Sequence, residues 1–116
     1  MSEMCPVDAL GDKSCKPCEG GVAPLTEPEI VEQLKSVVGW SLVDGCIVKV
    51  FRFKNYYQTL AFANAVAWIA HREDHHPELV LNYRTCEVRY NTHSIGGISE
   101  NDFICAAKIE QLQPVV

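Results

Sequence analysis

Three of the four histidines of this chain lie in one seven-residue stretch, HREDHHP, at positions 71–77. His75 and His76 are neighbours and directly precede Pro77, and the fourth histidine is His93. An unperturbed imidazole has a pKa near ~6.5, so it can accept and return protons around neutral pH. If the rings of His75, His76 and His93 converge, they predict general acid–base catalysis. The alternative is that each is an exposed residue or the partner of a helix C-terminus.

A zinc site is a second hypothesis for the same residues. His71 and His75 are four positions apart, so one face of a helix can present both, and His93 would add a third ligand. No glutamate or cysteine stands around them in a familiar metalloenzyme frame. We therefore predict no metal at this site.

The six cysteines do not form an obvious disulfide framework. Cys15 and Cys18 make one CxxC pair with Cys5 upstream, which indicates either metal or redox chemistry, or free thiols in a loose tail. The remaining three fall within apolar patterns and are expected to be small buried side chains: Cys46, Cys86 and Cys105. Free thiols are the expected state in a reducing compartment.

Length and charge exclude several classes of function. A chain of 116 residues with a net charge of -5 is one domain with little attraction for nucleic acid, which requires clustered Lys and Arg. It has no apolar run of about 18 residues that would span a membrane. The N-terminus lacks the basic stretch and apolar core of a signal peptide, so we expect the protein in the cytoplasm.

The N-terminal half predicts one helix and one hairpin. Residues 1–25 are rich in glycine and proline and are expected to be a flexible, cysteine-containing extension of a domain over 26–116. Thr26 and Glu29 form a capping box for a helix over 27–38, which Gly39 would end. Asp44-Gly45 is a turn signal between strands at 40–43 and 46–54.

The C-terminal half predicts a long helix, a second hairpin and a last helix. The apolar segment from residue 56 should end by about Asp74, because Pro77 disfavours helical geometry at His76. Strands around a turn near Arg84 follow, with alternate residues on one face: Cys86, Val88, Tyr90 and Thr92. A last helix begins near Ser99, where Asp102 is a capping carboxylate or a group that orients a histidine or a substrate nitrogen.

This order of elements, α-β-β-α-β-β-α, predicts an α+β fold. Two hairpins would form a four-stranded antiparallel sheet with three helices packed on one face. The opposite face or the sheet edges would then be candidate surfaces for self-association.

The residues that could do chemistry also resemble the pattern of the pterin-4a-carbinolamine dehydratase family. In that pattern a polar residue, His-His-Pro, an aromatic residue, a distant histidine and an aspartate follow in order. Here they are His71, His75-His76-Pro77, Tyr83, His93 and Asp102. The segment THSIGGISENDF at 92–103 is similar to the closing segment of the family, and CKPCEGGVAPL at 15–25 is similar to the extension of some bacterial members. The resemblance covers about Leu25 to Leu112.

The resemblance implies a hydro-lyase that removes water from 4a-hydroxytetrahydropterin and gives the quinonoid dihydropterin. It implies no metal and no redox cofactor, assembly as a homodimer or homotetramer, and a link to the aromatic amino acid hydroxylases whose pterin is recycled. A ring nitrogen must lose a proton and the hydroxyl must leave as water, which neutral imidazole and imidazolium can serve.

The resemblance also implies the site residues. The catalytic set would be His75, His76 and His93, with His75 as the acid for the leaving hydroxyl. Pro77, Thr92, Ser94 and Ile95 would line the pterin site, with Asp74 and Asp102 as supporting carboxylates.

Two positions depart from the family pattern. His71 stands where many members carry a glutamate that could orient an imidazole, and Leu79 replaces an aromatic that could stack on the pterin. Two alternative functions therefore remain: an accessory protein related to pterin or molybdopterin, and a non-enzymatic, dimerising protein-binding module.

Overall fold

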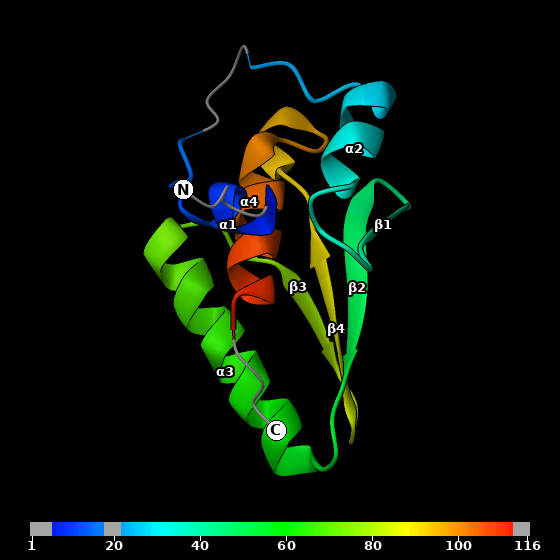
Figure 1. The fold of residues 1–116 in the computed structure, drawn as a ribbon, viewed down its shortest axis with the longest axis vertical. Helices are drawn as coiled ribbons and strands as arrows, with labels where there is room; N and C mark the ends of the chain where they lie inside the picture. The colour runs from blue at the N-terminus through cyan, green and yellow to red at the C-terminus, as the bar shows by residue number, and fades with distance from the viewer. Residues whose placement is uncertain (1–5, 18–21, 113–116) are drawn as a thin grey trace, which may run out of the picture.

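The protein is a four-stranded antiparallel sheet with its helices gathered on one face (Figure 1). The computed structural model describes residues 6–17 and 22–112. In chain order the elements are α1 Pro6–Gly11, α2 Glu27–Leu34, β1 Ser41–Val43, β2 Cys46–Arg52, α3 Tyr56–Glu73, β3 Glu78–Leu81, β4 Thr85–Tyr90, the short 3-10 helix η1 His93–Ile95, and α4 Glu100–Glu110. The strand order is β1-β2-β4-β3, and every neighbouring pair is antiparallel.

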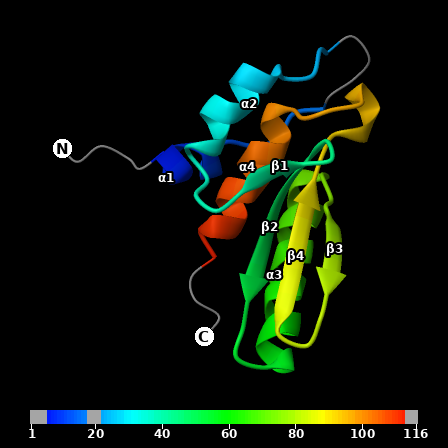
Figure 2. The same cartoon turned by 90° about the vertical axis from the view of Figure 1, so that its right-hand side faces the viewer.

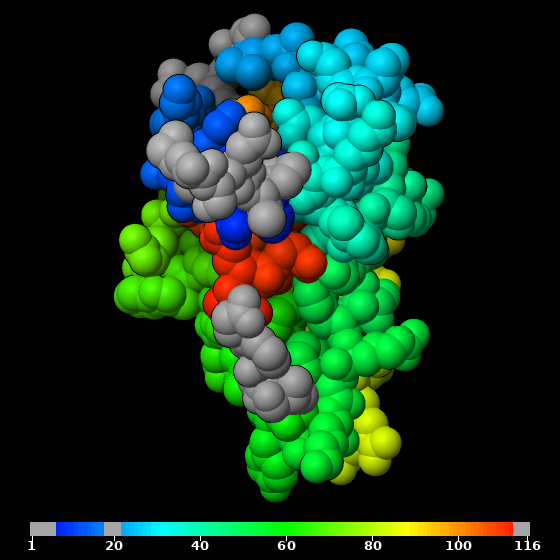
Figure 3. Space-filling model, viewed as in Figure 1, coloured from blue at the N-terminus to red at the C-terminus, as the bar shows by residue number. Residues whose placement is uncertain are grey.

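The predicted α+β class is confirmed, but the described ranges hold four α-helices and not three. The additional helix is α1, in a segment for which no helix was predicted. It has six residues, too few to repeat an apolar stripe that a sequence pattern could reveal. Leu10 is nevertheless buried, and α1 lies directly against α4 (Figure 3).

The two faces of the sheet differ in what covers them. Cys86, Val88 and Tyr90 of β4 point into the core and are fully buried, which confirms the predicted alternation. Glu87 and Arg89, which alternate with these residues, lie on the opposite face of the sheet. Their partners there are Val50 and Val48 of β2. Figure 2 looks onto that opposite face, which none of the described helices covers. Polar side chains are tolerated there because they can reach solvent.

Helix α2 begins as predicted but ends four residues early. The capping box of Thr26 and Glu29 is present. The Glu29 amide donates a hydrogen bond to the Thr26 hydroxyl, and the Thr26 amide donates one to the Glu29 carboxylate. After Leu34 the backbone changes to bonds between residues three apart, as in the 3.2 Å bond from the Val37 amide to the Leu34 carbonyl. This tighter turn buries Val37 completely, so the predicted extent of 27–38 was wrong at its C-terminal end.

Helix α3 ends where the proline predicts. Asp74 caps it in the left-handed conformation, with φ of 50°, and the His75 amide donates to the Ala70 carbonyl at 3.1 Å. The chain therefore leaves the helix abruptly, and His75, His76 and Pro77 form the link into β3. No helix within residues 6–17 and 22–112 meets the length and hydropathy that a membrane crossing needs.

Candidate active site

Two short segments that carry the candidate residues lie side by side at one end of the sheet. Residues 75–77 enter β3, and residues 92–95 leave β4. Because β3 and β4 are antiparallel and Glu78 pairs with Arg89, the start of β3 lies next to the end of β4. The hairpin register thus brings residues about 17 positions apart to one place.

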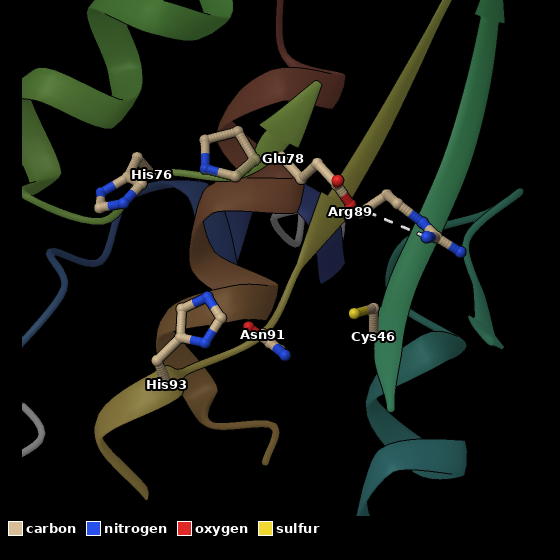
Figure 4. A pocket seen from close by; sticks show the side chains of 7 residues that line it. Cys46, His76, Glu78, Arg89, Asn91 and His93 are labelled. Atoms are coloured by element: carbon tan, nitrogen blue, oxygen red, sulfur yellow. Dashed lines mark ion pairs between the residues drawn. The ribbon is translucent and has the colours of Figure 1, made fainter. Parts of the chain in front are cut away.

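His76 and His93 line the same pocket. It has a volume of about 310 Å³, within the ordinary range for small-molecule sites, and it opens at the uncovered face of the sheet. In Figure 4 the two imidazoles stand on one side and Cys46 and Arg89 on the other. The complete lining is Cys46, His76, Pro77, Glu78, Arg89, Asn91 and His93.

The polar residues of this pocket, called here the His76/His93 pocket, carry charges of both signs. The Arg89 guanidinium lies 3.8 Å from a Glu78 carboxylate oxygen and 3.3 Å from one of Glu87. Cys46 was predicted to be a buried core residue, and this was wrong, because it is half-buried and faces the pocket. It stands first in β2 on the outward side, opposite Val43.

His75 points into an adjoining pocket of about 460 Å³, called here the His75 pocket. The predicted residues Asp74, Thr92 and Ser94 also line it. Its other walls come from the end of α3, the N-terminal segment and the start of α4: Cys15, Lys16, Pro17, Arg72, Glu73 and Asn101. No local pattern connects residues 15–17 with this site, because they are distant from it along the chain.

A fully buried carboxylate holds the His75 ring. The Nε2 atom donates to Oδ1 of Asp102 at 2.6 Å, while Oδ2 accepts from the Thr92 hydroxyl and from the Ser99 amide, both at 2.9 Å. The ring also stacks on Tyr90, with centroids 5.2 Å apart and planes 12° from parallel. Asp102 therefore does both things that its position allowed, because it caps α4 and it orients a histidine.

This environment sets the protonation of His75. Burial lowers the pKa of the ring, but the hydrogen bond and negative charge of Asp102 raise it by more, so the pKa of His75 is raised from its ordinary value. Since Nε2 is held by the carboxylate, Nδ1 is the ring nitrogen that would exchange a proton with a ligand. The arrangement favours an imidazolium that can act as an acid near neutral pH.

Seven of the nine residues predicted for the site line two neighbouring pockets. His76, Pro77 and His93 line the first, and Asp74, His75, Thr92 and Ser94 line the second. Asp102 lies behind His75 with no exposed surface, and Ile95 is half-buried and lines neither pocket. Three imidazoles were expected around one ligand; two share a pocket, and the third lies next to it. The catalytic role of these residues remains a prediction.

Three polar residues of the His76/His93 pocket were missed from the sequence: Glu78, Arg89 and Asn91. The alternation along the last strand would have found two of them. Positions 89 and 91 share the outward face with position 93, so a site at His93 predicts that Arg89 and Asn91 lie beside it.

The two departures from the family pattern lie together. His71 and Leu79 line a third pocket beside His76 and Pro77, and the exposed His71 ring lies 5.8 Å from the centroid of Trp68.

Within the two described ranges, no three His, Cys, Asp or Glu side chains are placed to hold a metal ion. Cys5 and Cys18 of the cysteine hypothesis lie outside those ranges.

Comparison with known proteins adds the family. The sequence profile described as Pterin 4 alpha carbinolamine dehydratase matches residues 23–112. A protein of Nitrosospira multiformis, provisionally named a pterin-4-alpha-carbinolamine dehydratase, is 58% identical over 106 residues, which cover 91% of this chain and 94% of its own. One of Nitrosomonas eutropha with the same provisional name is 59% identical over 104 residues, covering 89% of this chain and 92% of its own.

Solved structures agree with this result. The crystal structure titled transcriptional coactivator/pterin dehydratase from Brucella melitensis is 36% identical and covers 75% of this chain and 95% of its own, with a TM-score of 0.72. A pterin dehydratase-like protein described as a RuBisCO assembly factor of the alpha-carboxysome has a TM-score of 0.51 at 21% identity, covering 61% of this chain and 82% of its own, and shows a similar fold. The fold, the profile and the relatives together show that this chain belongs to the pterin 4 alpha carbinolamine dehydratase family.

Proposed function

We propose that this protein dehydrates 4a-hydroxytetrahydropterin to the quinonoid dihydropterin and water, as part of tetrahydropterin recycling. One observation carries the proposal: two imidazoles from separate segments, His76 and His93, face one pocket, and a third, His75, is held next to it by a buried carboxylate. Membership of the family supports the same activity.

In the proposed reaction a base removes a proton from a ring nitrogen of the substrate, and an acid protonates the 4a-hydroxyl. The electron pair of the N–H bond forms a C=N bond, and the C–O bond breaks to release water. A ring nitrogen of His76 or His93 would take the proton, because both imidazoles face the pocket. No group outside the protein is needed to balance these steps.

His75 is the proposed donor to the leaving hydroxyl. The bond to Asp102 raises its pKa, so a larger share of the ring is protonated at neutral pH than for an ordinary histidine. This assignment requires that a bound pterin extend from the His76/His93 pocket to the His75 pocket. His75 lines one pocket, and His76 and Pro77 line the other, so the pterin must lie across the boundary between the two pockets, where residues 75 and 76 meet.

The direct test is the decay of 4a-hydroxytetrahydropterin followed by stopped-flow absorbance with and without the purified protein. We expect decay to accelerate in proportion to protein concentration. A crystal soaked with a dihydropterin should place the ring against His76 and His93. Unchanged decay together with an empty pocket in the soaked crystal would contradict the proposal.

We also propose that the chain self-associates through the uncovered face or the edges of the sheet. Val43, Val50 and Val80 are each about two-fifths exposed on that face, and β1 and β3 are edge strands. This surface is also what a protein-binding module would use. Sedimentation equilibrium tests it: a mass of two or four chains supports self-association, and a monomer at high micromolar concentration contradicts it.

A further inference from the structure

The N-terminal segment holds one thiol against another thiol in the core. The Sγ atoms of Cys15 and Cys105 lie 3.6 Å apart, which is the separation of two sulfur atoms in contact. Cys15 is half-buried and lines the His75 pocket, whereas Cys105 is fully buried on α4. We propose that Cys15 and Cys105 are a redox modification site, at which a peroxide converts the two thiols into a reversible disulfide.

Hydrogen bonds fix Cys15 in place. Its amide donates to a carboxylate oxygen of Glu73 at 2.8 Å. The backbone of the next residue makes two hydrogen bonds with one side chain. The Lys16 amide donates to the Asn101 side-chain oxygen at 3.0 Å, and the Asn101 side-chain nitrogen donates to the Lys16 carbonyl at 2.5 Å. The pairing of Cys15 with Cys105 is therefore part of the folded structure and does not depend on a chance encounter of a loose tail.

The step to a disulfide is small. A disulfide has an S–S bond of about 2.05 Å, so the two sulfur atoms must approach by roughly 1.5 Å. The other described cysteines, Cys46 and Cys86, offer no such partner: Cys46 faces the uncovered side of the sheet, and Cys86 points into the core from β4. In the part of the chain that the structure describes, Cys15 and Cys105 are the two cysteines whose sulfur atoms are in contact.

The surroundings give the two sulfur atoms different roles. The hydrogen bond from the Cys15 thiol lowers the pKa of Cys105, and the Tyr90 hydroxyl and the charge of His75 lower it further against the effect of burial. The same contact with Cys105, together with burial, raises the pKa of Cys15. Cys105 is thus the better thiolate, and Cys15 is the sulfur that a solute can reach from the His75 pocket.

The chemistry balances with a peroxide as oxidant. The Cys15 thiol passes its proton to the Cys105 thiolate with which it is in contact, and the Cys15 sulfur then attacks one peroxide oxygen. The O–O bond breaks, the Cys15 sulfur becomes a sulfenic acid, and the hydroxide that leaves takes the proton from Cys105 to become water. The Cys105 thiolate then attacks the sulfenic sulfur, and the hydroxide that leaves takes up a proton to become a second water. The two sulfur atoms lose two electrons, which reduce the peroxide, and a dithiol reductant reverses the result.

Peptide mapping of the full-length protein tests the proposal directly. After treatment with hydrogen peroxide, alkylation and tryptic digestion without reductant, we expect peptide 14–35 joined to peptide 90–108, lighter than the two peptides by two hydrogens and separated again by dithiothreitol. Absence of this pair, with both cysteines still alkylated, would overturn the proposal. This measurement uses the wild-type chain and does not depend on the folding of any variant.

Cys18 lies in the same tryptic peptide as Cys15, so Cys18→Ser is the matched control. We expect Cys18→Ser to keep the cross-link and Cys15→Ser to lose it. A cross-link to Cys105 that persists in Cys15→Ser would assign the site to Cys18 and overturn the proposal.

As a second measurement, the disulfide should raise the thermal midpoint of oxidised wild type, because it closes a loop of about 90 residues in the unfolded chain. No rise in the wild type, or an equal rise in Cys15→Ser, would count against it.

Discussion

His75 and Asp102 lie 27 residues apart in the sequence, yet the imidazole Nε2 is 2.6 Å from a carboxylate oxygen. The carboxylate has no exposed surface, and its second oxygen is occupied by the Thr92 hydroxyl and the Ser99 amide. One aspartate therefore joins the end of α3, the end of β4 and the start of α4. The orientation of His75 and the position of α4 depend on the same side chain.

The first prediction concerns this aspartate. Asp102→Asn should reduce the free energy of unfolding by about 3 kcal/mol. The buried His75 ring loses its charged partner, and an amide group has only one oxygen to accept the bonds that the two carboxylate oxygens now accept. Urea denaturation measures the loss. Glu100→Gln, an exposed position in the first turn of the same helix, is the control and should change the stability by less than about 0.5 kcal/mol. Equal losses in both variants would contradict the role of Asp102.

The second prediction is the pH dependence of the same pair. Because the folded-state pKa of His75 is raised, the pair contributes its full stability below the unfolded pKa of about 6.5 and loses it as pH rises through the folded pKa. The stability advantage of wild type over His75→Gln should therefore be larger at pH 5.5 than at pH 9. NMR titration should give a pKa for His75 above its ordinary value in wild type and a lower pKa in Asp102→Asn. An advantage independent of pH would show that His75 is not charged in the folded protein.

The third prediction concerns the proposed reaction. His76→Ala and His93→Ala should each reduce kcat for pterin dehydration by about 10²-fold or more, the usual scale for loss of a general acid or base. His75→Ala should reduce kcat with a smaller change in KM, since it is the proposed proton donor and lies in the adjoining pocket.

Arg84→Ala is the control for these three variants. It lies in the β3–β4 turn, at the end of the hairpin opposite the pockets, and it is exposed. We expect it to keep wild-type kcat and KM. Near-normal rates in both His76→Ala and His93→Ala would remove the imidazoles from the mechanism.

The fourth prediction compares two ion pairs. Lys49 lies 2.9 Å from both carboxylate oxygens of Glu110 and donates to the Val38 carbonyl at 3.0 Å, with only about one-fifth of either side chain exposed. Glu110→Ala should therefore destabilise the protein by about 2 kcal/mol, since it leaves a largely buried ammonium without its partner. Glu32→Ala removes the exposed partner of Lys35 and should cost about 0.5 kcal/mol or less. Thermal unfolding of the two variants under one condition measures the difference.

The fifth prediction concerns two adjacent glycines after η1. A Cβ atom at Gly97 would lie 2.8 Å from Cβ of Pro24. Gly97→Ala should therefore displace Pro24 and disturb the hydrogen bond from the Leu25 amide to the Ile98 carbonyl, which should reduce the free energy of unfolding by about 1–3 kcal/mol. Gly96 has φ of +67° and open space around it, and Gly96→Asn should cost less than about 1 kcal/mol because asparagine tolerates this conformation. The opposite order of stability would contradict the packing of Pro24 on this loop.

Much of the fold was predictable because local signals and tertiary packing agree. The Ser99–Asp102 capping box, the turn at Asp44-Gly45 and the end of α3 before Pro77 all depend on residues close together in the sequence. The alternation along β4 predicted its buried face for the same reason. The C-terminal end of α2 was mispredicted because Val37 continues the apolar stripe of the helix in the sequence. In the structure Val37 is indeed buried, but on a tighter turn with bonds between residues three apart, which the apolar pattern does not distinguish from an α-helix.

The candidate site was only partly predictable. The residues of the His-His-Pro motif could be named, but the directions of the two rings could not. Asp74 adopts a left-handed conformation just before the two histidines, and successive side chains of the extended link then point to opposite sides. The His75 ring therefore contacts Asp102, whereas His76 faces the His76/His93 pocket. The contact of Cys15 with Cys105 has no local signal, since 90 residues separate the two.

The hairpin that pairs Glu78 with Arg89 has a consequence for how the chain can tolerate changes in length. An added residue in the β3–β4 turn can be absorbed as a longer loop, because that turn is remote from both pockets. One residue gained or lost between Pro77 and Glu78, or between Tyr90 and Thr92, would shift one imidazole against its partner by about 3.3 Å and reverse the side to which it points. Insertions and deletions in functional relatives should therefore collect at the turn and be rare beside the two histidine segments.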